Sequence, residues 1–266
     1  MSTKRDSYTP DISIVIPTYE NLNLVALSAM SALTQVDVNA EVILIDDSKS
    51  NQVEVFAATL KSRFPQLRYL AGVRNGNPVD NWNKGIDAAK GKYYILLHQD
   101  EILIDAKYAH EAVALLNTTN ALAVISRCQT VSIGRLSRFA LVERWARRLK
   151  PSPWLLYVAN WIGPTAVCAV RRDEAPRFDS SLTWLVDTDQ YARTLTMGNR
   201  IFYRNTVSVC SLAHHDAQIT ASIRSHTLAH YEITYLSKGR RDQIPVLIFW
   251  VVRITIFLRS VFSKKR

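Results

Sequence analysis

The chain has 266 residues, of which 48% are hydrophobic and 21% charged, and this balance excludes an intrinsically disordered protein. Its formal net charge of +10 favours a polyanionic partner, which could be a nucleic acid, an anionic membrane surface or a phosphorylated substrate. Three widely spaced cysteines, Cys128, Cys168 and Cys210, form neither a zinc pattern nor a disulfide framework, so we expect reduced thiols in a cytosolic protein. The polar start, MSTKRDSYTPD, has no apolar core, and we therefore expect no secretory signal.

The first half of the chain alternates between short apolar runs and segments with helical spacing. The apolar runs predict buried strands at 12–16, 41–45, 67–70 and 93–97. Helices are expected between them at about 24–34, 52–64 and 82–89, the first capped by Asn21 or Asn23 and the third ended by Gly91. This alternation predicts an α/β fold with a Rossmann-like, mainly parallel central sheet flanked by helices.

The fourth of these strands runs directly into a polar cluster that contains His98, Asp100 and Glu101. In an open α/β sheet, ligands bind at the carboxyl ends of the strands. Two carboxylates and an imidazole could hold a divalent cation there, either Mg²⁺ or Mn²⁺. A strand end followed by a solvated acidic turn would give the same residues, so they leave both interpretations open.

The second half is less regular. The pattern predicts helices at about 106–116, 187–197 and 219–237, and strands at 121–126, 165–170, 200–203 and 207–212. His214 and His215 follow the last strand, where one interpretation is a surface histidine pair. The segment 136–149 is basic and amphipathic, which fits a solvated helix face packed on the core and a membrane or phosphate contact equally well.

The C-terminal segment 244–262 is strongly apolar and is followed by Lys264, Lys265 and Arg266. Because Arg253 and Arg259 lie inside it, an interfacial helix on an anionic membrane fits better than a transmembrane span, and a packed or oligomer-forming helix is the other alternative. We therefore expect a globular domain at 1–240 and a membrane-associating helix at 241–266.

Four motifs occur in order between about Asp11 and Ser222: ISIVIPTYEN, EVILIDDSKSN, RNGNPVDNWNKGIDAAKGKYYILLHQDE and IGPTAVCAVRRDEAPRFDSSLTWLVDTDQYAR. Together they resemble the family-2 inverting glycosyltransferases of the A-type fold, over most of the chain. The resemblance implies that the protein transfers a sugar from a nucleotide-diphospho-sugar to an acceptor hydroxyl. It also implies Mn²⁺ or Mg²⁺ as cofactor and favours a UDP-sugar donor, with a dTDP-sugar as the other choice.

The resemblance assigns roles to individual residues. It implies Asp187 as the catalytic base; a helix N-terminal carboxylate without a chemical role is the other interpretation. Donor-binding residues would be Pro17, Tyr19, Glu20, Asp47, Asn75, Asn83, Lys84 and Asp100. Acceptor-side residues would be Trp184, Asp189 and Arg193, and metal ligands would be Asp100, His98, His214 and His215.

Two positions depart from the family pattern. His98 stands where the family usually has the first aspartate of its metal motif, so Asp100 alone matches the expected ligand. Val186 stands where a glutamate usually precedes the catalytic aspartate.

These features favour a metal-dependent glycosyltransferase attached peripherally to the cytoplasmic face of the membrane. The acceptor would be lipid-linked or a saccharide, in the synthesis of a cell-surface polysaccharide or glycolipid. The chain has no Gly-x-Gly-x-x-Gly after its first strand and no Gly-Lys-Ser/Thr loop, which argues against dinucleotide and P-loop proteins. Its basic residues gather beside the apolar C-terminus, which favours a membrane partner and no nucleic acid. The alternative is a catalytically idle protein that binds a membrane or polyanion through its basic surface.

Overall fold

A computed structural model describes residues 9–132, 153–158, 160–198, 200–213, 225–239 and 251. The basic segment 136–149, His214 and His215, the boundary at residue 240 and nearly all of the C-terminal segment lie outside the described residues. Within the described part, no helix is both long enough and apolar enough to cross a membrane.

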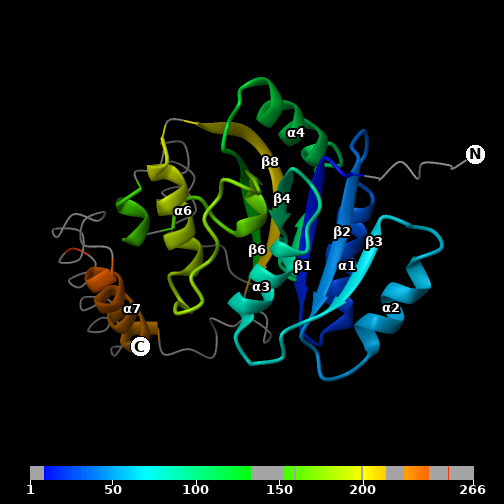
Figure 1. The fold of residues 1–266 in the computed structure, drawn as a ribbon, viewed down its shortest axis with the longest axis horizontal. Coiled ribbons are helices and arrows are strands. Elements are labelled where there is room, and N and C mark those ends of the chain that lie inside the picture. Colours follow the sequence, from blue (N-terminus) through cyan, green and yellow to red (C-terminus); the bar gives the residue numbers. More distant parts are fainter. Residues whose placement is uncertain are drawn as a thin grey trace, which may run out of the picture.

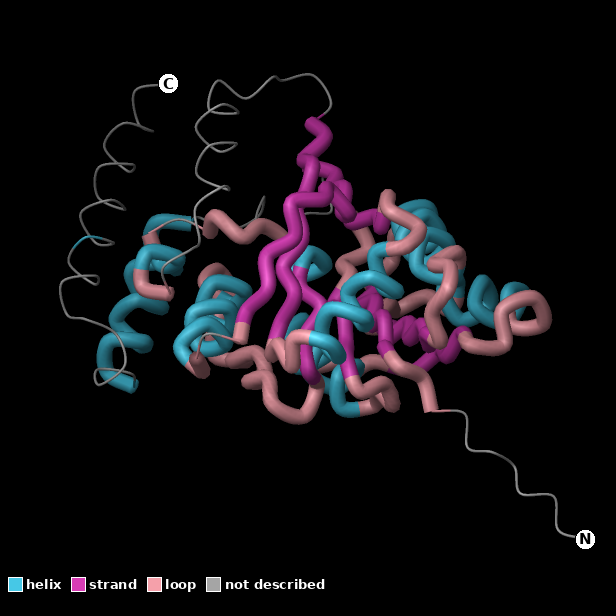
Figure 2. The backbone as a smooth tube through the Cα atoms, turned by 90° about the horizontal axis from the view of Figure 1, so that it is seen from above, coloured by secondary structure: helices cyan, strands magenta, loops and turns pink. Residues whose placement is uncertain are grey.

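One mixed sheet organises the described residues (Figure 1). Its strands are β1 (Ile12–Thr18), β2 (Ala40–Asp46), β3 (Leu67–Ala71), β4 (Tyr93–Leu96), β5 (Glu101–Leu103), β6 (Ala123–Ser132), β7 (Cys168–Arg171) and β8 (Ile201–Ala213). The α-helices are α1 (Leu22–Leu33), α2 (Gln52–Leu60), α3 (Pro78–Asp87), α4 (Tyr108–Thr118), α6 (Val186–Thr196) and α7 (Ser225–Gly239), and the 3₁₀ turns are η1 (Leu155–Tyr157) and η2 (Thr165–Val167). Figure 2 shows the strands as a central layer with helices around them.

The strand order is β3-β2-β1-β4-β7-β6-β8-β5. The strands β3, β2, β1 and β4 pair in parallel, which confirms the α/β prediction for this half. The crossover helices α1, α2 and α3 provide the connections that parallel pairing requires. Beyond β4 the pairing is antiparallel except between β6 and β8. The carboxyl ends of the four parallel strands therefore form one edge, where the polar residues after β1, β2 and β4 collect.

The sheet curls back on itself. The strand β5 follows β4 after only residues 97–100, yet it pairs with β8 at the far edge, four strand positions away. In a flat sheet these strands would lie about 19 Å apart. Five extended residues span at most about 18 Å, and the link is a turn, since Glu101 N–H donates to the carbonyl of His98 at 3.0 Å. The turn 97–100 therefore lies where the edge strand β5 curls back towards β4 in the middle of the sheet.

Two glycines allow close approach to β1. A Cβ on Gly85 of α3 would lie 2.5 Å from Cγ1 of Val15, so glycine lets the helix pack directly on the sheet. The expected role of Gly91 as the end of this helix is wrong, because α3 ends at Asp87 and is capped at Ala88. Gly91 is instead required where its backbone meets β1: a Cβ there would lie 2.6 Å from the nitrogen of Ser13.

The predicted elements of the second half needed three corrections. The expected strand at 165–170 begins as η2 and becomes β7 only at Cys168. The two expected strands at 200–203 and 207–212 form the single strand β8. The buried Arg204 lies within this strand because its guanidinium donates to Ser126, Ser208 and Glu111. The short β5 was not predicted, since its three residues show no pattern of their own.

Candidate functional site

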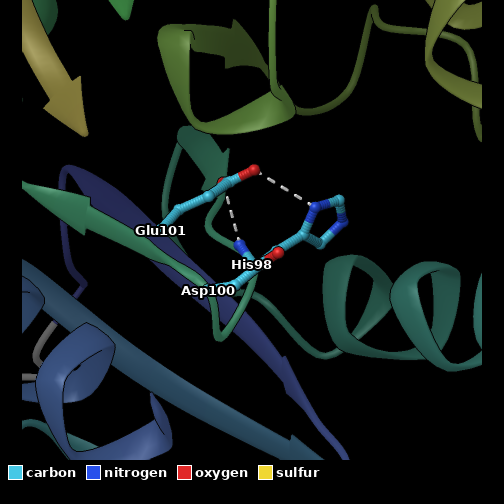
Figure 3. A group of neighbouring side chains, drawn as sticks. All are labelled: His98, Asp100 and Glu101. Carbon is cyan, nitrogen blue, oxygen red and sulfur yellow. Dashed lines mark hydrogen bonds and ion pairs between the residues drawn. The ribbon is translucent and has the colours of Figure 1, made fainter. Parts of the chain in front are cut away.

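The turn after β4 brings His98 and Glu101 into direct contact (Figure 3). The backbone N–H of His98 donates to Oε2 of Glu101 at 3.0 Å, and Nδ1 of His98 lies 3.3 Å from Oε1. Glu101 is buried at 2% exposure because it is the first residue of β5. The side chain of Glu101 therefore fixes both the backbone and the ring of His98.

The environment of His98 favours its protonated form. Burial alone lowers the pKa of the imidazole, but the charge of Glu101 and its hydrogen bond, with smaller contributions from Asp187 and Asp100, raise it to about 9. The ring packs against the indole of Trp82, with the ring centroids 4.7 Å apart. Its Nε2 is buried without a hydrogen-bond partner. The imidazole is thus held in place with one nitrogen unused.

These residues fit a divalent cation. Ligand atoms of His98, Asp100 and Glu101 lie within 4.8 Å of one another. Carboxylate oxygens are the ligands that Mg²⁺ prefers, and Mn²⁺ also accepts imidazole nitrogen. Because Glu101 is already engaged by His98, the geometry favours Asp100 and His98 as direct ligands and Glu101 as the carboxylate that orients the imidazole.

The far edge of the sheet reaches this cluster. Glu101 pairs with Ser211 in the antiparallel ladder of β5 and β8, and the N–H of Leu212 donates to the carbonyl of Asp100 at 3.0 Å. The described part of β8 ends at Ala213, so His214 and His215 stay predictions as metal ligands.

Asp187 lies in the first turn of α6. The residue is partly buried, and its Oδ1 is buried with no hydrogen-bond partner. Burial raises the pKa of its carboxyl from 3.8 to about 6; the charge of His98 opposes this rise and that of Glu101 adds to it. The charges of His98 and Glu101 thus act on Asp187, whose carboxylate is more basic than that of an exposed aspartate.

The other residues expected on the acceptor side differ in position. Trp184 precedes α6 and is 37% exposed. Asp189 is fully buried, where it accepts hydrogen bonds from Tyr157 at 3.0 Å and from Nε of Arg193 at 2.8 Å. Arg193 also donates to the carbonyl of Arg177 at 2.7 Å. In the structure Asp189 and Arg193 therefore hold α6 to its neighbours, and their acceptor-side role stays a prediction.

The two acids at the end of β2 have different surroundings. Asp46 is fully buried and accepts hydrogen bonds from the hydroxyls of Thr18, Ser48 and Tyr69, so it fixes the loop. Asp47 is partly exposed, and its Oδ1 accepts from the N–H of Arg74. Of the pair, Asp47 is the acid that a ligand at this edge could reach.

The loop after β1 joins two neighbouring strand ends. The backbone of Tyr19 makes two hydrogen bonds with the amide of Gln99, at 2.9 and 3.2 Å, and its side chain is 52% exposed. The carboxylate of Glu20 accepts from the N–H of Lys49 at 2.8 Å and from Ser50, which lowers its pKa. Pro17 is buried within β1 opposite Ile45. Glu20 and Pro17 thus shape the loop, while the ring of Tyr19 faces solvent.

The polar residues around α3 hold neighbouring segments. Asn83 donates to the carbonyl of Phe178 at 2.8 Å and accepts from its N–H at 3.1 Å. Lys84 donates to the carbonyls of Ala71 and Gly72. Asn75, in the exposed loop before α3, donates to Asp80 in the first turn of that helix at 2.7 Å. The expected donor-binding roles of these residues stay predictions, and their contacts in the structure are scaffold contacts.

Several residues at the site had no role assigned from the sequence. In the sequence, Trp82 fits the apolar spacing of an ordinary helix. Gln99 lies within the polar cluster after the fourth strand, and nothing in the sequence sets it apart from its neighbours. Glu232 of α7 is buried at 1% exposure and contacts the backbone before α6. Only the tertiary structure brings Trp82 to His98 and Glu232 to the backbone before α6.

The family model described as Glycosyl transferase family 2 matches residues 13–175. An uncharacterized glycosyltransferase of Rickettsia typhi is 26% identical over 235 residues, which cover 86% of this chain and 71% of the relative. The succinoglycan biosynthesis protein ExoO of Rhizobium meliloti is 30% identical over 92 residues, which cover 35% of this chain and 26% of ExoO. The match to ExoO is therefore local.

Two solved structures have a similar fold. S. aureus TarS 1–349 in complex with UDP-GlcNAc aligns with a TM-score of 0.67 at 14% identity and covers 86% of this chain and 66% of that one. A mannosyltransferase from Pyrobaculum calidifontis in complex with GDP-Man and Mn²⁺ aligns with a TM-score of 0.65 at 16% identity and covers 94% of this chain and 69% of that one. At these identities the likeness concerns the fold.

Proposed function

The chain belongs to glycosyl transferase family 2 and has the A-type glycosyltransferase fold, and from that membership we propose that it transfers a sugar, with inversion, from a nucleotide-diphospho-sugar to an acceptor hydroxyl. The observation that carries this proposal is the position of Asp187. A carboxylate of raised pKa starts helix α6 beside the acidic turn after β4. Inverting transfer needs a base beside the acceptor hydroxyl, on the face of the anomeric carbon opposite the leaving group.

Asp187 would act as the general base. Its unpartnered Oδ1 can accept a hydrogen bond from an acceptor hydroxyl and take the proton as the hydroxyl attacks the anomeric carbon. A pKa of about 6 keeps the carboxylate ionised at neutral pH and makes it a stronger base than an ordinary aspartate. Attack from the side of Asp187 on a sugar whose diphosphate lies at the turn after β4 would invert the anomeric centre.

The diphosphate would be held at the turn after β4. Asp100 and His98 would hold a divalent cation, with Glu101 orienting the imidazole, and a cation bound there would neutralise charge on the leaving diphosphate by Lewis acidity. The Mn²⁺ complex of the Pyrobaculum mannosyltransferase supports this proposal. His214 and His215 are proposed as further ligands from the sequence.

The nucleoside would lie over the ends of β1 and β2. Asp47 and Tyr19 are the partly exposed side chains at these two strand ends, suited to a hydrogen bond and to a stacking contact respectively. A UDP-sugar is the proposed donor, with a dTDP-sugar as the second choice. The UDP-GlcNAc complex of TarS supports the first, and the GDP-Man complex of the mannosyltransferase makes GDP a necessary comparison.

The acceptor is proposed to be a lipid-linked or saccharide hydroxyl in polysaccharide or glycolipid synthesis, which the local similarity to ExoO supports. Attachment to the inner face of the membrane is proposed from the apolar and basic sequence at 241–266. Sedimentation of the full chain with anionic liposomes, compared with a chain ending at residue 240, would test this attachment.

The central test is calorimetric titration of UDP, dTDP and GDP into the purified chain, with and without Mn²⁺. We expect one nucleotide to bind in a Mn²⁺-dependent manner, and its nucleotide-sugar to release nucleotide when incubated with the enzyme. Asp187→Asn should abolish release and keep nucleotide binding, whereas Asp173→Asn, which changes an exposed carboxylate, should alter neither. If no nucleotide binds under either condition, the chain would be a catalytically idle member of the family.

A further inference from the structure

The turn that precedes Asp187 is held by a residue from a distant helix. The carboxylate of Glu232 accepts hydrogen bonds from three consecutive backbone N–H groups: Thr183 at 2.6 Å, Trp184 at 2.9 and 3.1 Å, and Leu185 at 2.8 Å. Successive N–H groups that converge in this way form an anion-binding concavity. Here an internal carboxylate fills it.

Glu232 is itself firmly placed. It lies on α7 at 1% exposure, directly before the fully buried Ile233 and about one turn before Leu236, which is also fully buried. Tyr235 of the same helix donates to Asp179 at 3.3 Å, so α7 contacts the segment before α6 at a second point. Figure 1 shows α7 next to α6 at the end of the molecule opposite α2.

Resting on the proposed function, we propose that Glu232 is the positioning residue for the general base Asp187. The three N–H groups lie two to four residues before Asp187, so the direction in which α6 begins depends on them. A misplacement of about 1 Å at a reacting group lowers the rate by about a hundredfold. The helix α7 is therefore part of the active site, although it lies outside the matched residues 13–175.

The chemistry of the contact selects the test variant. In Glu232→Gln, one oxygen becomes an NH₂ group, which would face backbone N–H donors and cannot accept from them. The variant keeps the shape of the side chain but removes its negative charge and one of its two acceptor oxygens. Glu232→Asp keeps the charge on a shorter side chain and should restore part of what glutamine loses.

A matched control exists at the opposite edge of the sheet. Glu41 is also a buried carboxylate that accepts a backbone N–H, that of Lys90, and it bonds Ser13 and Arg68. It lies five residues before Asp46 in β2, about 17 Å along the strand from the ligand-binding edge. Glu41→Gln therefore reports the loss of a buried carboxylate without a change near Asp187.

The experiment combines amide hydrogen exchange with steady-state kinetics on the full chain. We expect Glu232→Gln to lose exchange protection at residues 183–185 and at least about tenfold in kcat, with the Kd for nucleotide in the presence of Mn²⁺ changed less than twofold. Glu232→Asp should recover part of kcat. Glu41→Gln should lower thermal stability but keep both kcat and the protection at 183–185.

The outcomes separate the two proposals. Unchanged protection in Glu232→Gln would overturn the contact, and lost protection with wild-type kcat would overturn its positioning role. An equal loss of nucleotide binding and kcat would show that the helix supports the whole fold instead. A wild-type chain that binds nucleotide but transfers no sugar would overturn the general-base role of Asp187 and, with it, the role of Glu232; the exchange result would still show whether the contact forms.

Discussion

The indole of Trp82 on α3 packs against the imidazole of His98 at the end of β4, with ring centroids 4.7 Å apart and an interplanar angle of 44°. The same indole meets Phe178 edge-on at 5.5 Å. Trp82 thus connects the candidate cation site with the segment that leads to α6, and it limits the orientations open to the imidazole.

Replacing this indole should destabilise the protein. We expect Trp82→Ala to lower the free energy of unfolding by about 3–5 kcal/mol, because a buried aromatic side chain leaves a cavity. Trp82→Phe, which keeps a ring between His98 and Phe178, should lose less. Urea unfolding in the presence of EDTA measures both, and equal losses in the two variants would show that the ring contact with His98 contributes nothing.

The carboxyl of Asp187 should oppose folding when it is ionised. Its pKa in the folded protein, about 6, exceeds the ordinary value of 3.8, so the folded state holds the proton more tightly. The stabilisation that comes from this tighter binding of the proton is complete below about pH 4. It is lost as the pH rises through about 6. About two pKa units correspond to at most about 3 kcal/mol, which partial exposure reduces.

We therefore expect Asp187→Asn to be more stable than the wild type at pH 7, by about 2 kcal/mol. The difference should shrink as the pH is lowered towards 4. Urea unfolding of the metal-free protein at several pH values measures it, with Asp173→Asn as the control. A difference that does not change with pH would indicate a cause other than ionisation of Asp187.

Binding of Mn²⁺ should release a proton from His98. The raised pKa of about 9 keeps the imidazole protonated at pH 7.5, and its nitrogen can bind a metal ion only when it is neutral. Calorimetry in two buffers of different ionisation enthalpy should give a release of about one proton per ion. His98→Asn should release almost none, whereas His110→Asn, at an exposed histidine, should behave as the wild type. Binding without proton release in the wild type would exclude His98 as a ligand.

A variant at Asn83 tests whether this side chain binds the nucleotide-sugar, as predicted from the sequence, or only holds Phe178 in place. Asn83→Ala leaves both the N–H and the carbonyl of Phe178 without their side-chain partner, so we expect a loss of about 1–3 kcal/mol in stability. Nucleotide affinity should stay within twofold of the wild type. Asn75→Ala, in an exposed loop, should lose less stability. A large rise in the nucleotide Kd with unchanged stability would instead favour direct donor binding by Asn83.

Gly85 tests the close packing of α3 on β1. The added Cβ in Gly85→Ala would meet Val15 at 2.5 Å and Ile45 at 3.0 Å, so we expect a loss of about 1–3 kcal/mol from overpacking. Gly239→Ala is the matched control, because a Cβ there meets nothing within 4 Å. Thermal unfolding compares the two, and similar behaviour would mean that the helix moves away from the sheet without penalty.

The parallel half of the fold was predictable from the sequence because β1, β2 and β4 are buried, largely apolar runs followed by polar residues. The start of α1 was predictable as well. Asn21 was one of two N-cap candidates, and its side chain accepts a hydrogen bond from the N–H of Leu24. The strand β8 was split in the prediction because Arg204 interrupts its apolar pattern, and the guanidinium is accommodated only by partners on β6 and α4.

From the residues alone, the candidate site was predictable where a residue follows a strand, whereas Asp187 at the start of α6 was named through the family resemblance. Asp100 and Asp47 were found because a strand end predicts their position. The burial of Asp189 was not predictable, since its partner Tyr157 lies 32 residues away in η1. Glu232 gave no signal, because a glutamate on a polar helix face is the ordinary case and only the fold brings it to the backbone before Asp187.

Because the sheet curls, the candidate site is completed by contacts between residues that lie far apart in the chain. Glu101 pairs with Ser211, and the turn before Asp187 needs Glu232, so both contacts join residues far apart in the chain. Pairings of such large sequence separation form late in folding. A chain that ends at residue 175, the end of the family match, would hold the parallel strands and the acids at their ends but lack both partners. During synthesis, the nucleotide-binding half would therefore exist before the protein could catalyse transfer.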